Sequence, residues 1–354
     1  MRIAQIAPLH EAVPPQFYGG TERVVSYLTD ALVDLGHDVT LFSSGDSDTK
    51  ATLEAVWPHA LRLDPSIRDA IAPHMVLLER VRQVAHEFDV LHSHLDYLPF
   101  SLFSQLDVPF VTTLHGRLDL PELQPVFSLF PKTPVISISN SQRLPLPHAN
   151  WLNTIYHGLP ENPLLPMSRK EPEYLAFLGR ICPDKGVDAA IVIARESGLP
   201  LKIAAKVDKA DHAYFKTTIE PLLSLPNIEF VGEITEAQKP AFLSGAKALL
   251  FPIAWSEPFG LVMIEAIACG TPVIAFNRGS VPEVIDHGLT GYICEDVHGA
   301  VCALRRLDEL SRTEIRAQFE RRFSAKVMAQ NYVDVYATLL QGVMHPVLRR
   351  AAAG

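Results

Sequence analysis

Short apolar runs alternate along the chain with longer segments in which apolar residues recur every three or four positions. The short runs predict buried strands, and the longer periodic segments predict helices. In the first half the predicted strands are residues 3–8, 39–43, 90–94, 110–114, 135–139 and 154–157. In the second half they are residues 174–178, 201–206, 228–231, 248–252, 273–276 and 291–293.

Helical patterns lie between these strands, for example at residues 22–35 and 73–88. Alternation of strand and helix requires right-handed crossovers, which give a parallel sheet covered by helices on both faces. We therefore expect an α/β protein with two doubly wound, Rossmann-like domains, one in each half of the chain. Ligands of such domains bind at the carboxyl ends of the strands.

The boundary between the domains is predicted at residues 159–172, which contain four prolines and no periodicity. This places the domains at residues 1–160 and 161–325. The chain becomes helical again after about residue 311, and we expect residues 326–354 to form a helix that packs back across the hinge. We expect a frayed tail from residue 347 onward.

Composition narrows the class of protein. The chain has 354 residues, of which 48% are hydrophobic and 20% charged, a balance typical of globular enzymes. The net charge of −9, without any run of five basic residues, argues against a nucleic-acid partner. The four cysteines have no C-x-x-C spacing, which fits a reducing cytoplasm better than a disulfide framework or a zinc site.

Membrane insertion is not expected. The first residues contain one positive charge and too short an apolar run for a signal peptide, so we expect a cytoplasmic protein. The longest largely apolar stretch, residues 262–276, contains Glu265, Gly270 and Pro272 and so cannot span a bilayer. Peripheral contact with a membrane through a helix is left open.

The most informative segment is residues 256–270, in which a loop follows an apolar strand and leads into a helix. The first N–H groups of that helix, at Phe259, Gly260 and Leu261, would bind an anion at the edge of the sheet. Glu257 and Glu265 could accept hydrogen bonds from hydroxyl groups nearby. Phosphate and sugar hydroxyls bound together describe a sugar-nucleotide site. The alternative is an ordinary strand–loop–helix unit with two surface glutamates.

Two further segments have glycines or cations after the first strand of their half of the chain. Gly19 and Gly20 follow the first strand and precede a helix, so the backbone there can approach a phosphate closely. Arg180 and Lys185 follow the first strand of the second half. The alternatives are a plain tight turn and two solvated surface charges.

We expect no metal. Asp46 and Asp48 resemble an Asp-x-Asp metal motif but lie in a polar loop that we interpret as a solvated turn. His92, His94 and Asp96 could ligate zinc, because alternate residues of a strand point to one face. As strand-end residues they fit better with acceptor binding or with bracing of the loop.

The chain resembles the retaining, sugar-nucleotide-dependent glycosyltransferases of family 4, which have the GT-B fold. The resemblance covers essentially the whole chain. It depends on four segments in the family's order, which are Tyr-Gly-Gly-Thr-Glu-Arg-Val-Val at 18–25, Thr-Leu-His-Gly at 113–116, Phe-Leu-Gly-Arg-Ile-Cys-Pro-Asp-Lys-Gly at 177–186 and EPFGLVMIEAIACGTPVIA at 257–275.

The resemblance implies a role for each candidate in the second domain, which would bind the nucleotide sugar. Glu265 would accept hydrogen bonds from the ribose, and Glu257 from the donor sugar. Arg180 and Lys185 would bind the diphosphate, with the backbone at Phe259, Gly260 and Leu261. The segment from Gly232 to Ile234 would contact the nucleobase.

The first domain would then bind the acceptor. His115 is implied to face the donor sugar, and Gly19 and Gly20 to approach its diphosphate. Glu22, His94 and Asp96 are weaker acceptor-side candidates, and Lys206 is another possible charge at the site. The acceptor itself, whether a small molecule, a glycan or a lipid, is not indicated.

The resemblance also implies that the anomeric configuration is retained, and no residue stands out as a nucleophile for double displacement. We therefore expect substitution on one face of the sugar, without a cofactor or metal, from a donor that is preferably a UDP-sugar. The alternatives are a nucleotide-sugar epimerase of the same fold and a non-catalytic two-lobed binding protein. A glycosidase and a dehydrogenase are disfavoured, the latter because no G-x-G-x-x-G follows a strand.

Overall fold

The computed structural model describes residues 1–16, 19–161 and 173–351. It divides into two compact units. One contains Met1–Gly158 together with the chain from Ala325 onward, and the other contains Leu159–Ser324. Most of the expected linker, residues 162–172, lies outside the described residues.

The N-terminal unit contains a seven-stranded sheet in the order β3-β2-β1-β4-β5-β6-β7, with every pair parallel. Its strands are β1 (Arg2–Ile6), β2 (Asp38–Ser44), β3 (Thr52–Trp57), β4 (Val90–Ser93), β5 (Phe110–Thr113), β6 (Pro134–Ser137) and β7 (Asn150–Thr154). Its helices are α1 (Gly20–Asp34), α2 (Ile71–Val84), α3 (Phe100–Phe103), α4 (Leu123–Leu129), α5 (Asn140–Arg143) and α13 (Ala325–Ala351).

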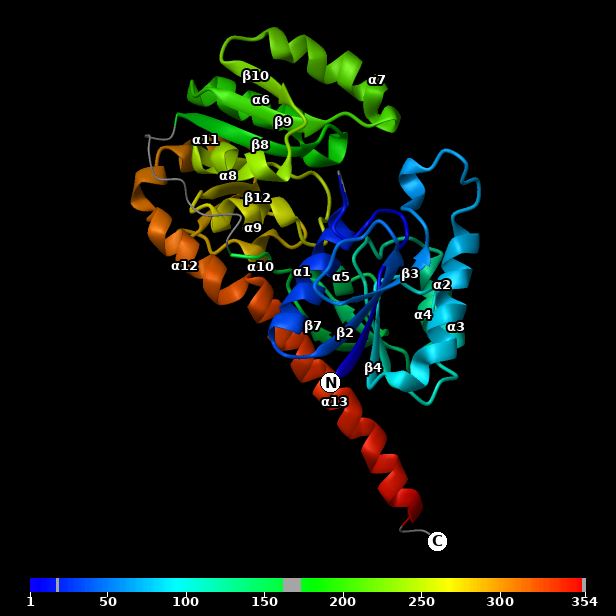
Figure 1. Cartoon of the computed structure of the whole chain (residues 1–354). Helices are drawn as coiled ribbons and strands as arrows, with labels where there is room; N and C mark the ends of the chain where they lie inside the picture. Colours follow the sequence, from blue (N-terminus) through cyan, green and yellow to red (C-terminus); the bar gives the residue numbers. More distant parts are fainter. Residues whose placement is uncertain (17–18, 162–172, 352–354) are drawn as a thin grey trace. The chain divides into compact units, whose positions relative to one another are not determined.

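The C-terminal unit contains a six-stranded parallel sheet in the order β10-β9-β8-β11-β12-β13, and Figure 1 shows β10, β9 and β8 in succession. Its strands are β8 (Tyr174–Arg180), β9 (Leu201–Lys206), β10 (Ile228–Gly232), β11 (Ala246–Phe251), β12 (Val273–Phe276) and β13 (Gly291–Cys294). Its helices are α6 (Val187–Ser197), α7 (His212–Tyr214), α8 (Lys239–Ser244), α9 (Leu261–Ala268), α10 (Val281–Val284), α11 (Val297–Leu304) and α12 (Arg312–Arg322). The expectation of two parallel α/β domains is confirmed.

Two strand predictions need correction. The strand expected at residues 154–157 is β7, which ends at Thr154. The edge strand β3 was not predicted, because none of the residues Thr52–Trp57 is buried and Glu54 interrupts its apolar residues. Edge strands bury less of their surface and therefore leave a weaker pattern.

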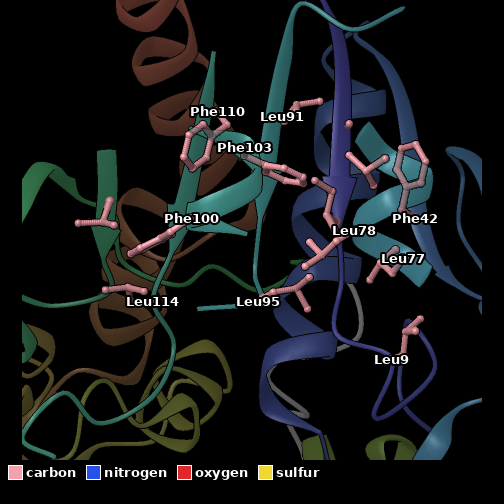
Figure 2. Packing of buried hydrophobic residues seen from close by; sticks show 14 of the residues in the cluster. Leu9, Phe42, Leu77, Leu78, Leu91, Leu95, Phe100, Phe103, Phe110 and Leu114 are labelled. Atoms are coloured by element: carbon pink, nitrogen blue, oxygen red, sulfur yellow. The ribbon is translucent and has the colours of Figure 1, made fainter. Parts of the chain in front are cut away.

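Apolar side chains between sheet and helices form a separate core in each unit. In the N-terminal unit, Phe42 of β2 packs with Leu77 and Leu78 of α2 (Figure 2). The rings of Phe103 and Phe110 meet edge to face, with centroids 5.7 Å apart, an arrangement that aromatic pairs favour. These contacts belong to the core that joins the sheet of this unit to its helices.

The late helix α13 packs against α1 within the N-terminal unit, and the side chains of Tyr332 and Tyr336 are fully buried there. The expected tail from residue 347 is wrong, since α13 continues to Ala351. The Leu, Arg and Ala residues of that segment favour a helix. None of the described helices combines the length and apolar character that a membrane crossing needs.

Gly186 shows how closely the loops of the C-terminal unit pack. It adopts φ +68° at the start of α6, and a Cβ atom there would lie 2.1 Å from the carbonyl oxygen of Pro252. Gly198 at the other end of α6 has a similar φ of +71°, but nothing lies within 4 Å of a Cβ atom. The two glycines that flank α6 therefore share a left-handed backbone conformation and differ in the room that surrounds a Cβ atom.

We predict that Gly198→Ala lowers the free energy of unfolding by about 1 kcal/mol, the cost of a left-handed alanine. Gly186→Ala should cost about 1–3 kcal/mol more, because the backbone at Pro252 must move. Urea unfolding of the two variants measures the difference. Equal losses would show that the close approach at Pro252 is absent.

Candidate active site

The predicted donor-binding residues of the C-terminal unit all follow the carboxyl ends of its strands. Arg180 ends β8, Gly232 ends β10, and Glu257 lies in the loop between β11 and α9. Because all strands are parallel, these ends lie at one edge of the sheet. Gly232 and Ile234 belong to the edge strand and its loop, so β9 and β8 separate them from β11.

Lys185 and Glu257 form an ion pair, with side chains only 18% and 12% exposed. The indole Nε1 of Trp255 donates a second hydrogen bond to Glu257 Oε2, over 2.9 Å. The backbone joins the same loops, since the Ala254 N–H donates to the carbonyl of Asp184 over 2.9 Å. The cation that sequence reasoning assigned to the diphosphate thus lies beside the carboxylate assigned to the donor sugar.

Arg180 and Lys206 lie side by side at the ends of the paired strands β8 and β9. Asp208 bridges them, 3.4 Å from Arg180 Nη1 and 3.1 Å from Lys206 Nζ. Both cations remain about one-third exposed. Partly exposed cations at a strand end can bind a phosphate at little desolvation cost.

Glu265 is buried one turn inside α9 and pairs with Lys239 of α8 at 2.7 Å. Lys239 also pairs with Glu236 at 2.7 Å. Burial opposes the charge of the lysine, but the two glutamates outweigh it and raise the pKa of Lys239, so the ammonium persists. Sequence reasoning missed Lys239, although the capping box from Thr235 to Gln238 signals a helix start there.

The backbone at the start of α9 is held by the loop after β12. Ser280 Oγ donates to the carbonyl of Phe259 over 2.8 Å, and the Ser280 N–H donates to the carbonyl of Glu257 over 3.0 Å. Gly260 has φ +80° and precedes Leu261, the first residue of the helix. Phe259 as a whole is buried, and its ring packs edge to face with that of Phe323.

In the N-terminal unit, Gly19 and Gly20 precede and begin α1, as expected. A Cβ atom at Gly19 would lie 2.9 Å from the Pro15 side chain, so the loop itself already requires glycine. Glu22 is buried and accepts hydrogen bonds from its own N–H and that of Glu11. Burial raises the pKa of Glu22. Tyr18 of the same segment lies outside the described residues.

The structure brings His94, Asp96 and His115 together at the ends of β4 and β5. His94 Nδ1 lies 2.9 Å from His115 Nε2, and the His115 backbone N–H donates to the Asp96 carboxylate. Asp96 adopts φ +49°, which aspartate tolerates better than most residues. The His157 ring stacks on that of His115, with centroids 5.3 Å apart.

The turn that contains His115 is held by a side chain that sequence reasoning missed. Gln142 Nε2 donates to the carbonyls of Leu114 and Gly116 over 2.9 and 2.8 Å, and its Oε1 accepts from the Ile138 N–H. Gln142 is buried at the start of α5. No sequence pattern marks a glutamine whose partners lie 26 and 28 residues away.

The residues considered for a metal have other partners. His92 is fully buried, with Nε2 2.8 Å from Thr113 Oγ1 and Nδ1 2.7 Å from Tyr336 Oη. Asp46 accepts the N–H of Ala60 over 3.1 Å and braces its loop. Within the described ranges, no cluster of three or more His, Cys, Asp or Glu side chains is arranged for a metal ion.

Comparisons with known proteins identify the family of each unit. Residues 166–323 match the family model of glycosyl transferases group 1, and residues 18–158 match that of glycosyltransferase family 4. The chain is 27% identical to a glycogen synthase of Mycobacterium tuberculosis, with 94% of each chain covered.

Two solved structures show the same fold. AviGT4, a glycosyltransferase involved in avilamycin A biosynthesis, is 25% identical, with a TM-score of 0.73 and 97% and 98% of the two chains covered. Alr3699/HepE of Anabaena, in complex with UDP and glucose, is 17% identical, with a TM-score of 0.73 over 96% of this chain and all of that one.

Burial of the histidines predicts a dependence of stability on pH. Burial lowers the pKa of His92 well below 6.5, so the folded protein keeps it neutral while the unfolded chain protonates it. The contribution of neutral His92 to the free energy of unfolding is therefore fully present above pH 6.5 and is lost as the pH falls below that value. The loss is about 1.4 kcal/mol per pH unit for each such histidine.

We predict that the free energy of unfolding falls from pH 7 to pH 5, and that the fall is shallower in His92→Gln. His59→Gln, at an exposed turn, is the matched control and should keep the wild-type slope. Urea unfolding at several pH values measures all three slopes. Identical slopes for wild type and His92→Gln would contradict a neutral, buried His92.

Proposed function

Because the chain belongs to the group 1 glycosyltransferases of the GT-B fold, we propose that it moves a hexosyl group from a nucleoside-diphosphate sugar to an acceptor hydroxyl. The observation that supports this most is the alternation of cations and carboxylates at the carboxyl edge of the C-terminal sheet. Cations there suit a diphosphate, and carboxylates suit sugar hydroxyls.

Arg180, Lys206 and Lys185 would bind the diphosphate, together with the first N–H groups of α9. Glu257 would accept hydrogen bonds from the donor sugar, and Glu265 from the ribose. Each carboxylate already forms an ion pair with a lysine, Glu257 with Lys185 and Glu265 with Lys239. Gly232 and Ile234 would contact the nucleobase. We propose UDP as the nucleotide, by analogy with the bound UDP of HepE.

The transfer would proceed on one face of the sugar. The bond between the anomeric carbon and the diphosphate oxygen breaks, and the acceptor oxygen bonds to the same face of that carbon. The proton of the acceptor hydroxyl passes to the departing diphosphate oxygen. The protein's part is to orient both substrates and to stabilise the negative charge on the leaving group through Arg180 and Lys185. This scheme needs no metal.

The direct test combines a binding panel with product analysis. Thermal shifts with UDP, GDP, ADP and their glucose conjugates identify the donor, since a ligand that binds only the folded protein raises its melting temperature. NMR of the product then gives the anomeric configuration. A retained linkage is expected, and an inverted one excludes same-face substitution.

Two outcomes would replace the proposal with another function. Isomerised donor in the absence of acceptor would indicate an epimerase. Donor binding without release of nucleoside diphosphate, with acceptors or water, would indicate a binding protein.

We predict that Lys185→Ala and Arg180→Ala each lower the rate of UDP release from UDP-glucose by about 10²–10³-fold. Each substitution removes a positive charge of the protein that would stabilise the negative leaving group. Lys202→Ala is the matched control, since Lys202 lies near the opposite end of β9 and pairs with Glu229. Circular dichroism confirms that each variant is folded. Wild-type rates in folded Lys185→Ala and Arg180→Ala would remove the leaving-group role.

A further inference from the structure

A continuous chain of hydrogen-bonded side chains runs through the interior of the N-terminal unit, from α13 to His115. Tyr336 Oη lies 3.1 Å from Gln5 Nε2, and Gln5 Oε1 lies 2.8 Å from His94 Nε2. His94 Nδ1 in turn lies 2.9 Å from His115 Nε2. Tyr336, Gln5 and His94 are between 0 and 2% exposed, so water does not compete for these bonds.

Gln5 gives this chain a direction, because one end of its amide only donates and the other only accepts. Nε2 donates to Tyr336, so Oε1 must accept a proton from Nε2–H of His94. The position of Gln5 on β1, next to β4 in the sheet, places the amide between Tyr336 and His94.

A neutral imidazole has one N–H and one bare nitrogen. Burial lowers the pKa of His94 well below 6.5 and that of His115 to about 3, so both rings are neutral at physiological pH. His94 uses its N–H toward Gln5, and its bare Nδ1 must therefore accept from Nε2–H of His115. The remaining nitrogen of His115, Nδ1, is then bare.

His115 Nδ1 is closed off from solvent and has no hydrogen-bond partner among the residues that the structure describes. Reversal of the Gln5 amide would reverse the donors and acceptors along the chain and leave an N–H at this position. An unpaired buried N–H is rarer in proteins than an unpaired acceptor. The direction that leaves a bare, accepting Nδ1 is therefore the favoured one.

We propose that Gln5 and His94 are positioning residues that fix the tautomer of His115, so that its Nδ1 accepts a hydrogen bond from a hydroxyl group of the substrate. This rests on the proposed function for the identity of the substrate. The hydroxyl belongs either to the donor sugar or to the acceptor, and both present the same O–H group. A substrate that lacks this hydroxyl leaves a buried acceptor unpaired and is disfavoured.

The first test reads the tautomers directly and does not depend on activity. In the full-length protein labelled with 15N-histidine, NMR should show His94 and His115 protonated at Nε2 at pH 7. Gln5→Met removes both ends of the amide, and the fixed tautomer of His115 should give way to a mixture. Gln5→Glu keeps an oxygen for His94 and should restore the Nε2–H form. Nδ1–H at His115 in the wild type would overturn the proposal.

The second test links the tautomer to the substrate. Gln5→Met should lower kcat/KM with UDP-glucose about tenfold, the scale of one hydrogen bond to a neutral partner, and Gln5→Glu should recover most of it. Gln105→Met, which alters an exposed glutamine, is the control. Recovery in Gln5→Glu separates positioning from loss of packing.

UDP-glucose analogues in which single hydroxyls are replaced by fluorine show whether the hydroxyl that donates to His115 belongs to the donor or to the acceptor. If the hydroxyl is on the donor, kcat/KM of the wild type should be about tenfold lower with one analogue than with UDP-glucose. The same analogue should cause no further loss of kcat/KM in Gln5→Met. If it is on the acceptor, every donor analogue should behave alike and Gln5→Met should raise the KM for acceptor. Wild-type kinetics in a Gln5→Met protein with altered tautomers would overturn the proposal. Absence of UDP release from the wild type would instead count against the proposed function.

Discussion

Parallel pairing of every strand is the constraint on which the rest of this structure depends. It places the loop after each strand at one edge of its sheet, so residues distant in sequence are brought together. In the C-terminal unit that edge combines Arg180, Lys206 and Glu257 from three different strand ends. In the N-terminal unit it combines Gly19 with the turn that contains His115. An antiparallel strand inserted into either sheet would send one of these loops to the opposite edge.

Ion pairs then hold the charged side chains at the carboxyl edge of the C-terminal sheet. Each glutamate of the Glu-x7-Glu segment pairs with a lysine from another part of the chain, Glu257 with Lys185 after β8 and Glu265 with Lys239 of α8. In each pair the lysine lies beside a largely buried carboxylate, so neither charge is left without a partner. A sugar nucleotide suits this arrangement, because its diphosphate can share the cations and its hydroxyls can share the carboxylates.

The sequence was sufficient for most strands and for the strand–loop–helix segment that contains Glu257 and Gly260, because apolar runs and strand-to-helix turns leave patterns within a few positions. It was insufficient for edge strand β3, in which no residue is buried and Glu54 interrupts the apolar residues. It also missed Lys239, Gln142 and Gln5. Each of these side chains also has a partner 26 or more residues away, Glu265 for Lys239, Leu114 for Gln142 and Tyr336 for Gln5, and only the folded chain brings these pairs together. Residues 347–351 were expected to form a frayed tail, but they continue α13, because the charged and apolar residues there also suit a helix.

The proposed function makes one central claim about the molecule, that the diphosphate of a nucleotide sugar binds at the carboxyl edge of the C-terminal sheet. A crystal structure of the protein soaked with UDP-glucose tests it most directly. The claim predicts phosphate oxygens within hydrogen-bond distance of Arg180 and Lys185, and ribose hydroxyls on Glu265. A donor bound elsewhere on the protein, with these three side chains untouched, would contradict it.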